Sequence, residues 1–435
     1  MIRQAKSAVD RFRKSALARD SGWMFLGFGL RVIVQAGYFV LIARALGPHE
    51  YGGFVGATAL IAIVAPFVSI GAGNLLIKNV SRDKGLFSEY WGNALVMLTL
   101  SGIVLLLGVL SLARFVLPSS IPWTLVLLVS ISDLMVVRVT DIVGQAFLAM
   151  GKAKYTAKIS LLPYVLRFIG AAIVLFVWHR ATALCWGWFY LGSTVVSCAV
   201  AAQLSNKLLG PPKIALWRIR GELAEGMYYG TGLSAQTIYN DIDKTMLARL
   251  STLDATGIYA AAYRLIDVAF TPVRSVLYAA YPNFFLHGKG GIAASYAYAK
   301  KLLPKMMGYS TLIFVCLFVA APILPIVLGG EYSRTVEALR WLALLPLLKT
   351  LHYFLADSLT GAGYQGLRTS AQIFVAILNV GLNFWLIPVY SWRGAAWASL
   401  ASDGALVLAM YAALMFIMTK EARVAMEFSD GRERA

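Results

Sequence analysis

Residues 92–116, GNALVMLTLSGIVLLLGVLSLARFV, decide the fold class of this chain. Arg114 is the one charged side chain in this stretch of 25 residues. A helix rises about 1.5 Å per residue, so roughly 20 apolar residues cross a hydrocarbon core of about 30 Å. Similar windows recur along the chain, in which 59% of the 435 residues are hydrophobic and 14% are charged. No water-soluble fold of this length buries so much apolar surface, so the sequence predicts a membrane protein.

About twelve windows are predicted to be transmembrane helices, which makes the chain an all-α polytopic membrane protein. Residues 1–21 precede the first window and lack the apolar region and cleavage site of a signal peptide, so we expect a retained basic tail. The predicted spans are 22–43, 51–76, 92–116, 123–149, 156–178, 183–203, 227–250, 256–286, 302–328, 336–360, 370–389 and 394–418.

The longest polar interruption, near residues 204–226, separates six predicted helices from six. Its Pro211-Pro212 pair cannot continue a helix. An internal repeat supports this division, because Arg44 and Gly52 recur as Arg249 and Gly257 at an offset of 205. We therefore predict two pseudo-symmetric six-helix lobes around a central cavity, a plan found in transporters. The predicted parts are a basic cytoplasmic tail (1–21), an N-terminal lobe (22–205), a cytoplasmic linker (206–226), a C-terminal lobe (227–420) and a cytoplasmic tail (421–435).

The formal net charge of +18 could indicate a nucleic-acid partner, but its distribution indicates a membrane. Most of the 39 Lys and Arg residues fall in the tails and in the loops on the side that holds both termini. By the positive-inside rule, both termini are predicted to be cytoplasmic. We therefore predict a multi-pass protein of the bacterial inner (cytoplasmic) membrane, with no nucleic-acid partner.

Several predicted spans carry ionisable or amide side chains, which are costly at membrane depth and are therefore candidate functional groups. These side chains fall at helical spacing on one face of the helix in the first, seventh and eighth spans. They are Arg31 and Gln35 in the first span; Asp133, Arg138 and Asp141 in the fourth; Gln236, Asn240, Asp243 and Lys244 in the seventh; Arg264, Asp267 and Arg274 in the eighth; and Lys349 and Asp357 in the tenth.

Two interpretations of these charges remain open. In the first, Arg264 with Asp267, Arg138 with Asp141 and Asp243 with Lys244 only pair and lock helices together. In the second, the basic and amide groups face a hydrated cavity and bind the diphosphate and sugar of an anionic ligand, for which the planar guanidinium fork is well suited. The candidate substrate ligands are Arg31, Gln35, Asn240, Lys244, Arg264 and Arg274, and the candidate ion-coupling groups are Asp243 and Asp267.

Motifs of intrinsic catalysis are missing from the sequence. It contains no GxxxxGK[ST] phosphate loop, and its four histidines and three cysteines stand singly, outside any HExxH or CxxC spacing. The loops between the predicted spans leave no room for a soluble catalytic domain. We therefore predict a protein that is not an enzyme and needs neither a cofactor nor a metal.

The run ARALGPHEYG at residues 43–52 closes the first predicted helix and opens the second. It resembles the signature of the polysaccharide-transporter branch of the multidrug/oligosaccharidyl-lipid/polysaccharide exporter superfamily, the Wzx-type O-antigen flippases. The segment from Asp243-Lys244 to Leu265 resembles the same family's pattern at its seventh and eighth helices. The resemblance extends over the whole length through the twelve spans and two lobes.

This resemblance implies a flippase for undecaprenyl-diphosphate-linked oligosaccharide, a repeat unit of O-antigen or exopolysaccharide, moved from the cytoplasmic to the periplasmic leaflet by ion-coupled alternating access. It also implies a cavity lined by helices one, two, seven and eight, often with basic residues. The implied partners are the lipid-linked oligosaccharide, membrane lipids and, as candidates, a polysaccharide polymerase and a chain-length regulator. The second span here has no basic residue in its core, unlike lipid II flippases, which argues against peptidoglycan precursor as the cargo.

Two other classes compete with this hypothesis. A cation-coupled exporter of drugs or small molecules, from the related multidrug branch, would share the lobed plan but favour an acidic cavity. An envelope enzyme such as an O-antigen polymerase or ligase would need a large periplasmic loop, and no predicted periplasmic loop exceeds about a dozen residues. The basic balance of the charged spans favours the flippase.

Overall fold

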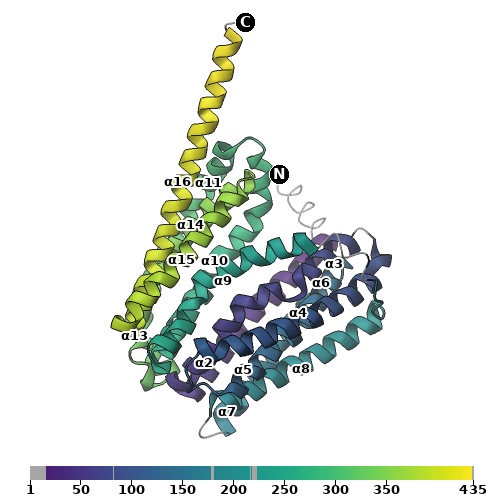
Figure 1. Ribbon diagram of the computed structural model, residues 1–435, viewed down its shortest axis with the longest axis vertical. Helices are drawn as coiled ribbons and strands as arrows, with labels where there is room; N and C mark the ends of the chain where they lie inside the picture. The colour runs from purple at the N-terminus through teal and green to yellow at the C-terminus, as the bar shows by residue number, and fades with distance from the viewer. Residues whose placement is uncertain (1–15, 82, 178–180, 216, 218–222, 434–435) are drawn as a thin grey trace, which may run out of the picture. The chain divides into compact units, whose positions relative to one another are not determined.

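The computed structural model describes residues 16–81, 83–177, 181–215, 217 and 223–433. Almost all of this part of the chain is helical, and it contains no β-strand (Figure 1). Most of the predicted basic tail, residues 1–15, and part of the predicted linker, 216 and 218–222, lie outside the described residues. The chain divides into two compact units, Met1–Ser234 (unit 1) and Ala235–Ala435 (unit 2), which are described one at a time below.

Unit 1 is built from long helices joined by short turns. Its elements are α2 (Ala16–Val64), η1 (Ala65–Gly71), α3 (Ala72–Val80), η2 (Lys84–Leu86), α4 (Phe87–Val116), α5 (Trp123–Ser130), η3 (Ile131–Val136), α6 (Val137–Ala149), α7 (Ala153–Val177) and α8 (Ala183–Leu208). The helix α9 (Leu223–Leu250) begins in unit 1 and passes into unit 2.

Unit 2 continues in the same manner. Its further elements are α10 (Leu253–Gly288), α11 (Ile292–Ala320), η5 (Ala321–Ile323), α12 (Leu324–Leu328), η6 (Gly330–Tyr332), α13 (Thr335–Leu342), α14 (Leu345–Gly361), α15 (Gln365–Tyr390) and α16 (Trp392–Glu433). The last helix therefore runs on into the segment from residue 421 onward that the sequence predicts to be a tail.

Eight helical segments of the described chain are long and apolar enough to cross a membrane. One of them, Gly29–Ser69, contains most of the first two predicted spans. The other three predicted spans are also helical, as α5–η3–α6, α9 and α10, and each of them carries at least three charged residues.

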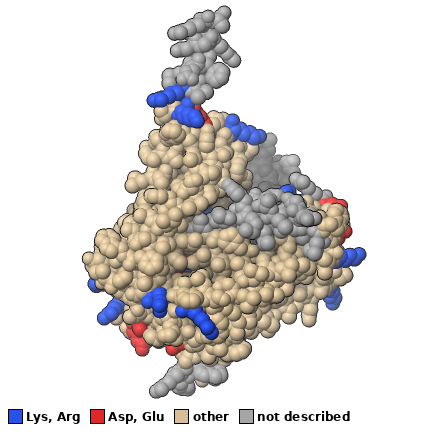
Figure 2. Space-filling model, in the orientation of Figure 1, with Lys and Arg blue, Asp and Glu red and all other residues tan. Residues whose placement is uncertain are grey.

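The surface of the protein fits a lipid environment. Most of the face visible in Figure 2 carries neither basic nor acidic side chains, and the charged residues gather in a few groups. Large apolar side chains are exposed on several helices, including Phe115, Phe176 and Trp385, which are 77%, 76% and 72% exposed. Such apolar exposure is favourable only when hydrocarbon covers it.

The junction between the first two spans is a kink inside α2. Gly47 has φ 68° and ψ 172°, outside the helical region, and Pro48 follows it. The internal repeat offset of 205 places Thr252 at the corresponding point, where α9 has ended and α10 begins. The Thr252 hydroxyl caps α10 by accepting a 3.1 Å hydrogen bond from the backbone N–H of Ala255. The two copies of the repeat thus break at equivalent positions.

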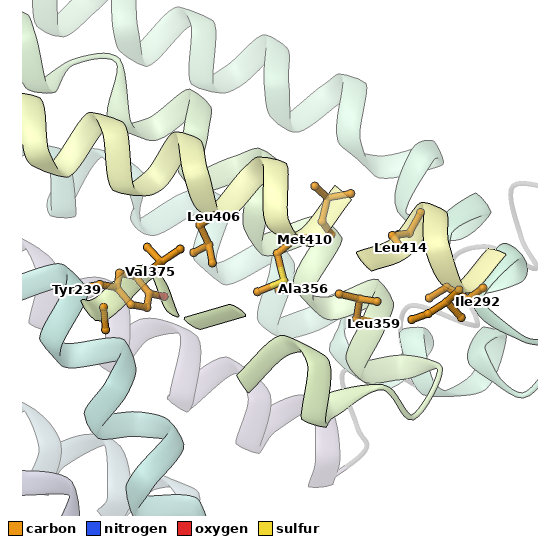
Figure 3. Close-up of a cluster of buried hydrophobic side chains, with 11 residues drawn as sticks. Tyr239, Ile292, Ala356, Leu359, Val375, Leu406, Met410 and Leu414 are labelled. Carbon is orange, nitrogen blue, oxygen red and sulfur yellow. The ribbon is translucent and has the colours of Figure 1, made fainter. Parts of the chain in front are cut away.

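The core of unit 2 follows helical spacing. Leu406, Met410 and Leu414 lie at intervals of four residues on one face of α16, and all three are fully buried. Figure 3 shows them in one cluster with Ala356 and Leu359 of α14. This apolar seam holds α14 and α16 together and fixes the polar side chains that the same two helices carry.

In unit 1, α2 and α7 pack closely along their length. A Cβ atom built on Gly27 would lie 2.6 Å from the Cβ of Ala157, so only glycine permits this approach. The close contact places Arg31, one turn further along α2, opposite the middle of α7.

Candidate functional site

Arg31 is a half-buried cation at membrane depth in unit 1. Its Nη2 donates a 2.6 Å hydrogen bond to the hydroxyl of Tyr164 on α7, and its guanidinium carbon lies 4.5 Å from the centroid of that ring. Among the described residues, Arg31 forms no ion pair with an acid. Gln35, one turn further along α2, is half-buried. Arg31 therefore differs from the paired cations of the same unit, because its partner is an aromatic phenol.

Arg167 lies on α7 three residues after Tyr164 and is only 6% exposed. Its guanidinium carbon is 3.8 Å from the ring centroid of Tyr190 on α8 and 5.8 Å from that of Tyr164. Its Nη2 is 3.9 Å from Oδ1 of Asp133, which is longer than a hydrogen bond. Both Nε and Nη2 are buried without a hydrogen-bond partner among the described residues. Such groups are rare in folded proteins and call for an explanation.

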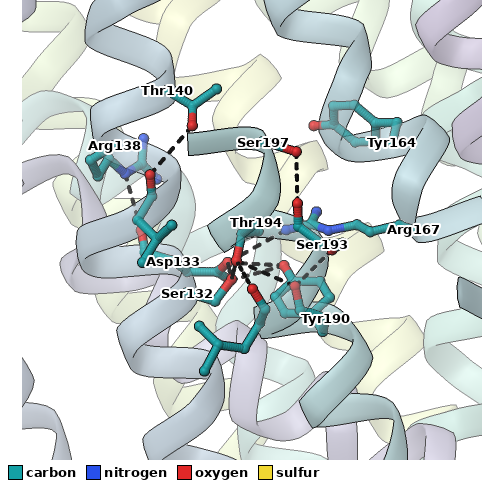
Figure 4. Close-up of polar contacts among 12 residues, drawn as sticks. Ser132, Asp133, Arg138, Thr140, Tyr164, Arg167, Tyr190, Ser193, Thr194 and Ser197 are labelled. Carbon is teal, nitrogen blue, oxygen red and sulfur yellow. Dashed lines mark hydrogen bonds and ion pairs between the residues drawn. The ribbon is translucent and has the colours of Figure 1, made fainter. Parts of the chain in front are cut away.

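Asp133 faces Arg167 from η3, a single π-helical turn between α5 and α6. The hydroxyl of Tyr190 donates to both carboxylate oxygens, at 3.0 and 3.1 Å, and Ser132 Oγ donates to Oδ1 at 3.2 Å. Figure 4 shows these side chains directed toward one another from three helical segments. π turns occur often at functional sites because they change the direction of the side chains they carry. The carboxylate is thus held mainly by neutral hydroxyl groups.

The predicted pairing of Arg138 with Asp141 is present in unit 1. Arg138 Nη1 lies 3.2 Å from Asp141 Oδ2, and Arg138 Nε also donates a 3.2 Å bond to the backbone carbonyl of Asp133. The side chains of this pair are 33% and 50% exposed. The guanidinium of Arg138 is therefore already bonded to Asp141 and to the backbone of the π turn.

In unit 2, Lys244 of α9 is surrounded by acceptors. Its Nζ donates to Oδ1 of Asp241 at 2.5 Å and to the backbone carbonyl of Asn240 at 3.0 Å, and lies 3.8 Å from Asp243. It also lies 4.0 Å from the ring centroid of Tyr263. The ammonium group is thus closely coordinated within its own helix and by α10.

Asp243 is 1% exposed, and its carboxylate is fully hydrogen-bonded. Oδ1 accepts a 2.8 Å bond from the backbone N–H of Lys244, and Oδ2 accepts bonds from the hydroxyl of Tyr259 and, at 3.0 Å, from Oγ of Ser399. This network joins α9, α10 and α16. The predicted pair of Asp243 with Lys244 is therefore one part of a larger buried cluster.

A second lysine of unit 2 joins this region. Lys349 of α14 is 3% exposed and donates to Oδ1 of Asn240 at 2.8 Å and to the hydroxyl of Tyr263 at 2.9 Å. The structure thus brings Asn240 together with Lys349, a contact between helices more than 100 residues apart in the chain. Lys349 and Lys244 both contact Tyr263, and Lys349 also bonds to Asn240, so two of the predicted site residues, Asn240 and Lys244, lie in one polar cluster.

The charged face of α10 is more open. Asp267 Oδ1 lies 3.8 Å from Arg274 Nη2, and these side chains are 34% and 57% exposed. Arg274 also lies over the ring of Phe270 at 5.8 Å. Arg264 is half-buried and has contacts of its own. The structure gives Asp267 a loose contact with Arg274, and the predicted pairing of Asp267 with Arg264 stays a prediction.

Sequence reasoning missed two charged residues. Arg167 lies in the fifth predicted span, nine residues after Lys158, and Asp403 is the one charged residue of the twelfth. In the structure Asp403 is 5% exposed and lies 3.3 Å from Nε2 of His352 on α14. The signal was available, because any ionisable residue inside an apolar window is a functional candidate. Neither residue has a second charged side chain within two helical turns in its own span, so neither forms part of a charged helical face.

A two-lobed, all-helical membrane protein that keeps charged clusters inside each unit is typical of a membrane transporter. The chain belongs to the polysaccharide biosynthesis protein family, whose model matches residues 17–286.

Solved structures share the fold over nearly the whole length. A multidrug resistance MATE family transporter of the MOP superfamily, in an inward-facing conformation, matches with a TM-score of 0.74 at 14% identity, covering 94% of this chain and 99% of the other. The lipid II flippase MurJ, in an inward closed conformation, matches with a TM-score of 0.69 at 12% identity, covering 90% and 87%. No curated protein sequence matches the chain. The predicted all-α, two-lobed transporter architecture is confirmed.

Proposed function

We propose that this protein is a flippase that moves an undecaprenyl-diphosphate-linked oligosaccharide from the cytoplasmic to the periplasmic leaflet by ion-coupled alternating access. The proposed location is the bacterial inner membrane, with both termini cytoplasmic. The cargo would be a repeat unit of O-antigen or exopolysaccharide, and a polysaccharide polymerase and chain-length regulator are proposed partners. Membership of the polysaccharide biosynthesis family and a shared fold with a lipid II flippase support this proposal.

The observation that carries the proposal is Arg31. A cation without an acidic partner at membrane depth is unfavourable unless it meets an anion or water. Arg31 is half-buried, bonds to a phenol and forms no ion pair among the described residues. A diphosphate supplies several oxygen acceptors for the guanidinium donors of Arg31. Such a group would be held without any covalent chemistry by the protein.

The other proposed ligands differ in how freely they could reach a substrate. Arg274 is 57% exposed and only loosely paired with Asp267, so it can exchange its carboxylate for a phosphate. Lys244 is 7% exposed and donates hydrogen bonds to two acceptors, which makes it a weaker candidate for direct contact. Gln35, Asn240 and Arg264 are half-buried and would bind sugar hydroxyls or phosphate oxygens.

For ion coupling we propose Asp243 and Asp267, which play different parts. Asp267 is one-third exposed, so an ion or proton can reach it from water. Asp243 is buried in a network of hydroxyl groups that links α9, α10 and α16. A change in its charge would therefore alter the hydrogen bonds that join these three helices. Carboxylates at membrane depth commonly serve such relays.

The proposal is tested by complementation of a flippase-null strain. We expect Arg31→Ala, Arg264→Ala and Arg274→Ala to abolish surface polysaccharide while membrane insertion is retained, and lipid-linked repeat units should accumulate in the cytoplasmic leaflet. Arg114→Ala is the matched control, because Arg114 also lies over an aromatic ring, 5.2 Å from Trp123, but is exposed at the end of α4. Three fully active site variants would contradict the headgroup site.

A second candidate is a cation-coupled exporter of drugs or small molecules. The observation that favours it is the TM-score of 0.74 with a multidrug transporter over 99% of that chain. Purified protein in proteoliposomes would then expel a cationic dye against its gradient, and the chain would raise drug resistance in an exporter-deficient strain. Dye transport without complementation of the flippase-null strain would favour this candidate over the flippase.

A further inference from the structure

The unpaired nitrogens of Arg167 are the starting point. In a protein interior nearly every buried N–H group has an acceptor, and a guanidinium has five such groups to satisfy. Arg167 leaves Nε and Nη2 without an acceptor among the described residues, although its side chain is only 7% exposed. A residue whose role was to lock helices together would be fully paired. The arrangement therefore suits a cation that takes a different acceptor during the transport cycle.

Arg167 and Arg31 share one aromatic ring. Their guanidinium carbons lie 5.8 and 4.5 Å from the centroid of Tyr164, which is on α7 with Arg167 and opposite Arg31 on α2. Two cations beside one phenol repel each other, and the acid nearest to Arg167 stands at 3.9 Å. Arg138 brings a further positive charge but is occupied by Asp141. The cluster as a whole carries an excess of positive charge that an anion with several oxygens would neutralise.

Asp133 can release Arg167 without being left unsatisfied. Its carboxylate accepts hydrogen bonds from Tyr190 and Ser132, at 3.0 to 3.2 Å, and these do not depend on the guanidinium. A buried carboxylate that lost its only partner would be strongly unfavourable, and here the hydroxyl groups prevent that. Asp133 can therefore form an ion pair with Arg167 and can also remain hydrogen-bonded when Arg167 binds another anion.

We propose that Arg167 is a second headgroup ligand, which leaves Asp133 to join Arg31 on a diphosphate. This inference rests on the proposed function, and it assigns to unit 1 the choice of a diphosphate over a monophosphate. Two guanidinium forks match two phosphate groups, whereas a monophosphate engages one fork and leaves the second cation with Asp133. Arg167 is in this view a specificity-determining residue.

The test measures the binding of two lipids to the purified full-length protein in nanodiscs: undecaprenyl diphosphate and undecaprenyl monophosphate. We expect Arg167→Gln to weaken diphosphate binding about tenfold and to leave monophosphate binding almost unchanged. Arg167→Lys should also lose most of the preference, because it keeps the charge but not the fork. Arg114→Gln serves as the control and should keep the wild-type preference. An Arg167→Gln variant that folds and retains that preference would overturn the inference.

Asp133→Asn provides a test that does not require replacing Arg167. Asparagine keeps an acceptor for Tyr190 and Ser132 but no longer competes as an anion, so diphosphate binding should tighten about threefold. A structural salt bridge would give the opposite result, with Asp133→Asn and Arg167→Gln both weakening binding and both lowering the melting temperature. Unchanged or weaker binding by Asp133→Asn contradicts the proposal even if Arg167→Gln fails to fold.

Two further binding measurements distinguish the role of Arg167 from the proposed flippase function. Inorganic diphosphate should compete with the lipid for the wild type and lose that ability in Arg167→Gln; competition that survives the substitution unchanged contradicts the proposal. If Arg31→Gln abolishes lipid binding while Arg167→Gln keeps the preference, the inference fails and the proposed flippase function stands. If the wild type binds neither lipid, both fail.

Discussion

Arg31 on α2 and Tyr164 on α7 are joined by a 2.6 Å hydrogen bond although 133 residues separate them in the chain. The bond fixes the guanidinium against the ring face without neutralising its charge. Tyrosine thus does what a carboxylate could not, because it orients the cation and leaves it available to an anion. The same ring also lies beside Arg167, so the phenol organises both cations of unit 1.

Tyr164→Phe should therefore reduce transport without abolishing it. The substitution keeps the ring beside both guanidinium groups and removes only the hydrogen-bond acceptor of Arg31. The lost hydrogen bond is worth about 1 to 2 kcal/mol in holding the guanidinium in place. We expect a several-fold decrease in surface polysaccharide in the complementation assay, and a much larger decrease for Tyr164→Ala, which removes the ring as well. Equal activity of the two variants would show that the ring has no role.

Gly27→Ala should destabilise unit 1. A Cβ at this position would meet Ala157 Cβ at 2.6 Å, so α2 and α7 would have to separate, at about 1 to 3 kcal/mol. Gly29→Ala is a matched control two residues away, because nothing lies within 4 Å of its Cβ position. Thermal unfolding of the purified variants in detergent should show a lower melting temperature for Gly27→Ala alone. A similar fall in both would point to a backbone effect instead of close packing.

Asp243→Ala should be the most destabilising single change at the polar cluster of unit 2. It leaves the hydroxyl groups of Tyr259 and Ser399 without their shared acceptor and removes a counter-charge from Lys244, at about 3 to 5 kcal/mol. Asp243→Asn keeps an acceptor and should cost clearly less. The comparison is made by chemical denaturation. If Asp243→Asn folds normally but transports without dependence on the coupling ion, the proposed ion-coupling role gains support.

The loop between α14 and α15 offers a prediction that depends on pH. Tyr364 donates a 2.9 Å hydrogen bond to Glu421 Oε1, and this bond to a carboxylate raises the pKa of the phenol. A raised pKa in the folded state means that the stabilisation is complete below pH of about 10 and is lost as the pH rises through the folded value. Wild type should exceed Tyr364→Phe in melting temperature at pH 7, and this advantage should shrink as the pH rises beyond the usual pKa of tyrosine. A constant difference across this range would exclude the linkage.

Much of the fold was predictable because membranes impose a simple rule. Apolar windows of sufficient length located the helices, and Pro211-Pro212 located the interruption between α8 and α9. The signature around Gly47 and its repeat at Thr252 identified equivalent junctions. These features are local, so a short stretch of sequence is enough to define them.

The candidate site was predictable only in part, because its contacts join helices that are distant in sequence. The charges of α9 and α10 stood out through their spacing, yet Lys349 as the partner of Asn240 depends on how α14 packs. The nearest charged side chain to Arg167 on its own helix is Lys158, nine residues away, so periodicity gave no reason to select Arg167. The π turn that carries Asp133 has no composition signal, since it differs from an α-helix only in its hydrogen-bond step.

That π turn also bears on how the family can vary. A π-helical turn holds one residue more than the α-helical turn it replaces, and one residue corresponds to about 100° of rotation along a helix. Deleting a single position between Ile131 and Val136 would restore a regular helix and swing the carboxylate of Asp133 away from Tyr190. A relative with a one-residue deletion in this segment would therefore have no acid facing the position of Arg167.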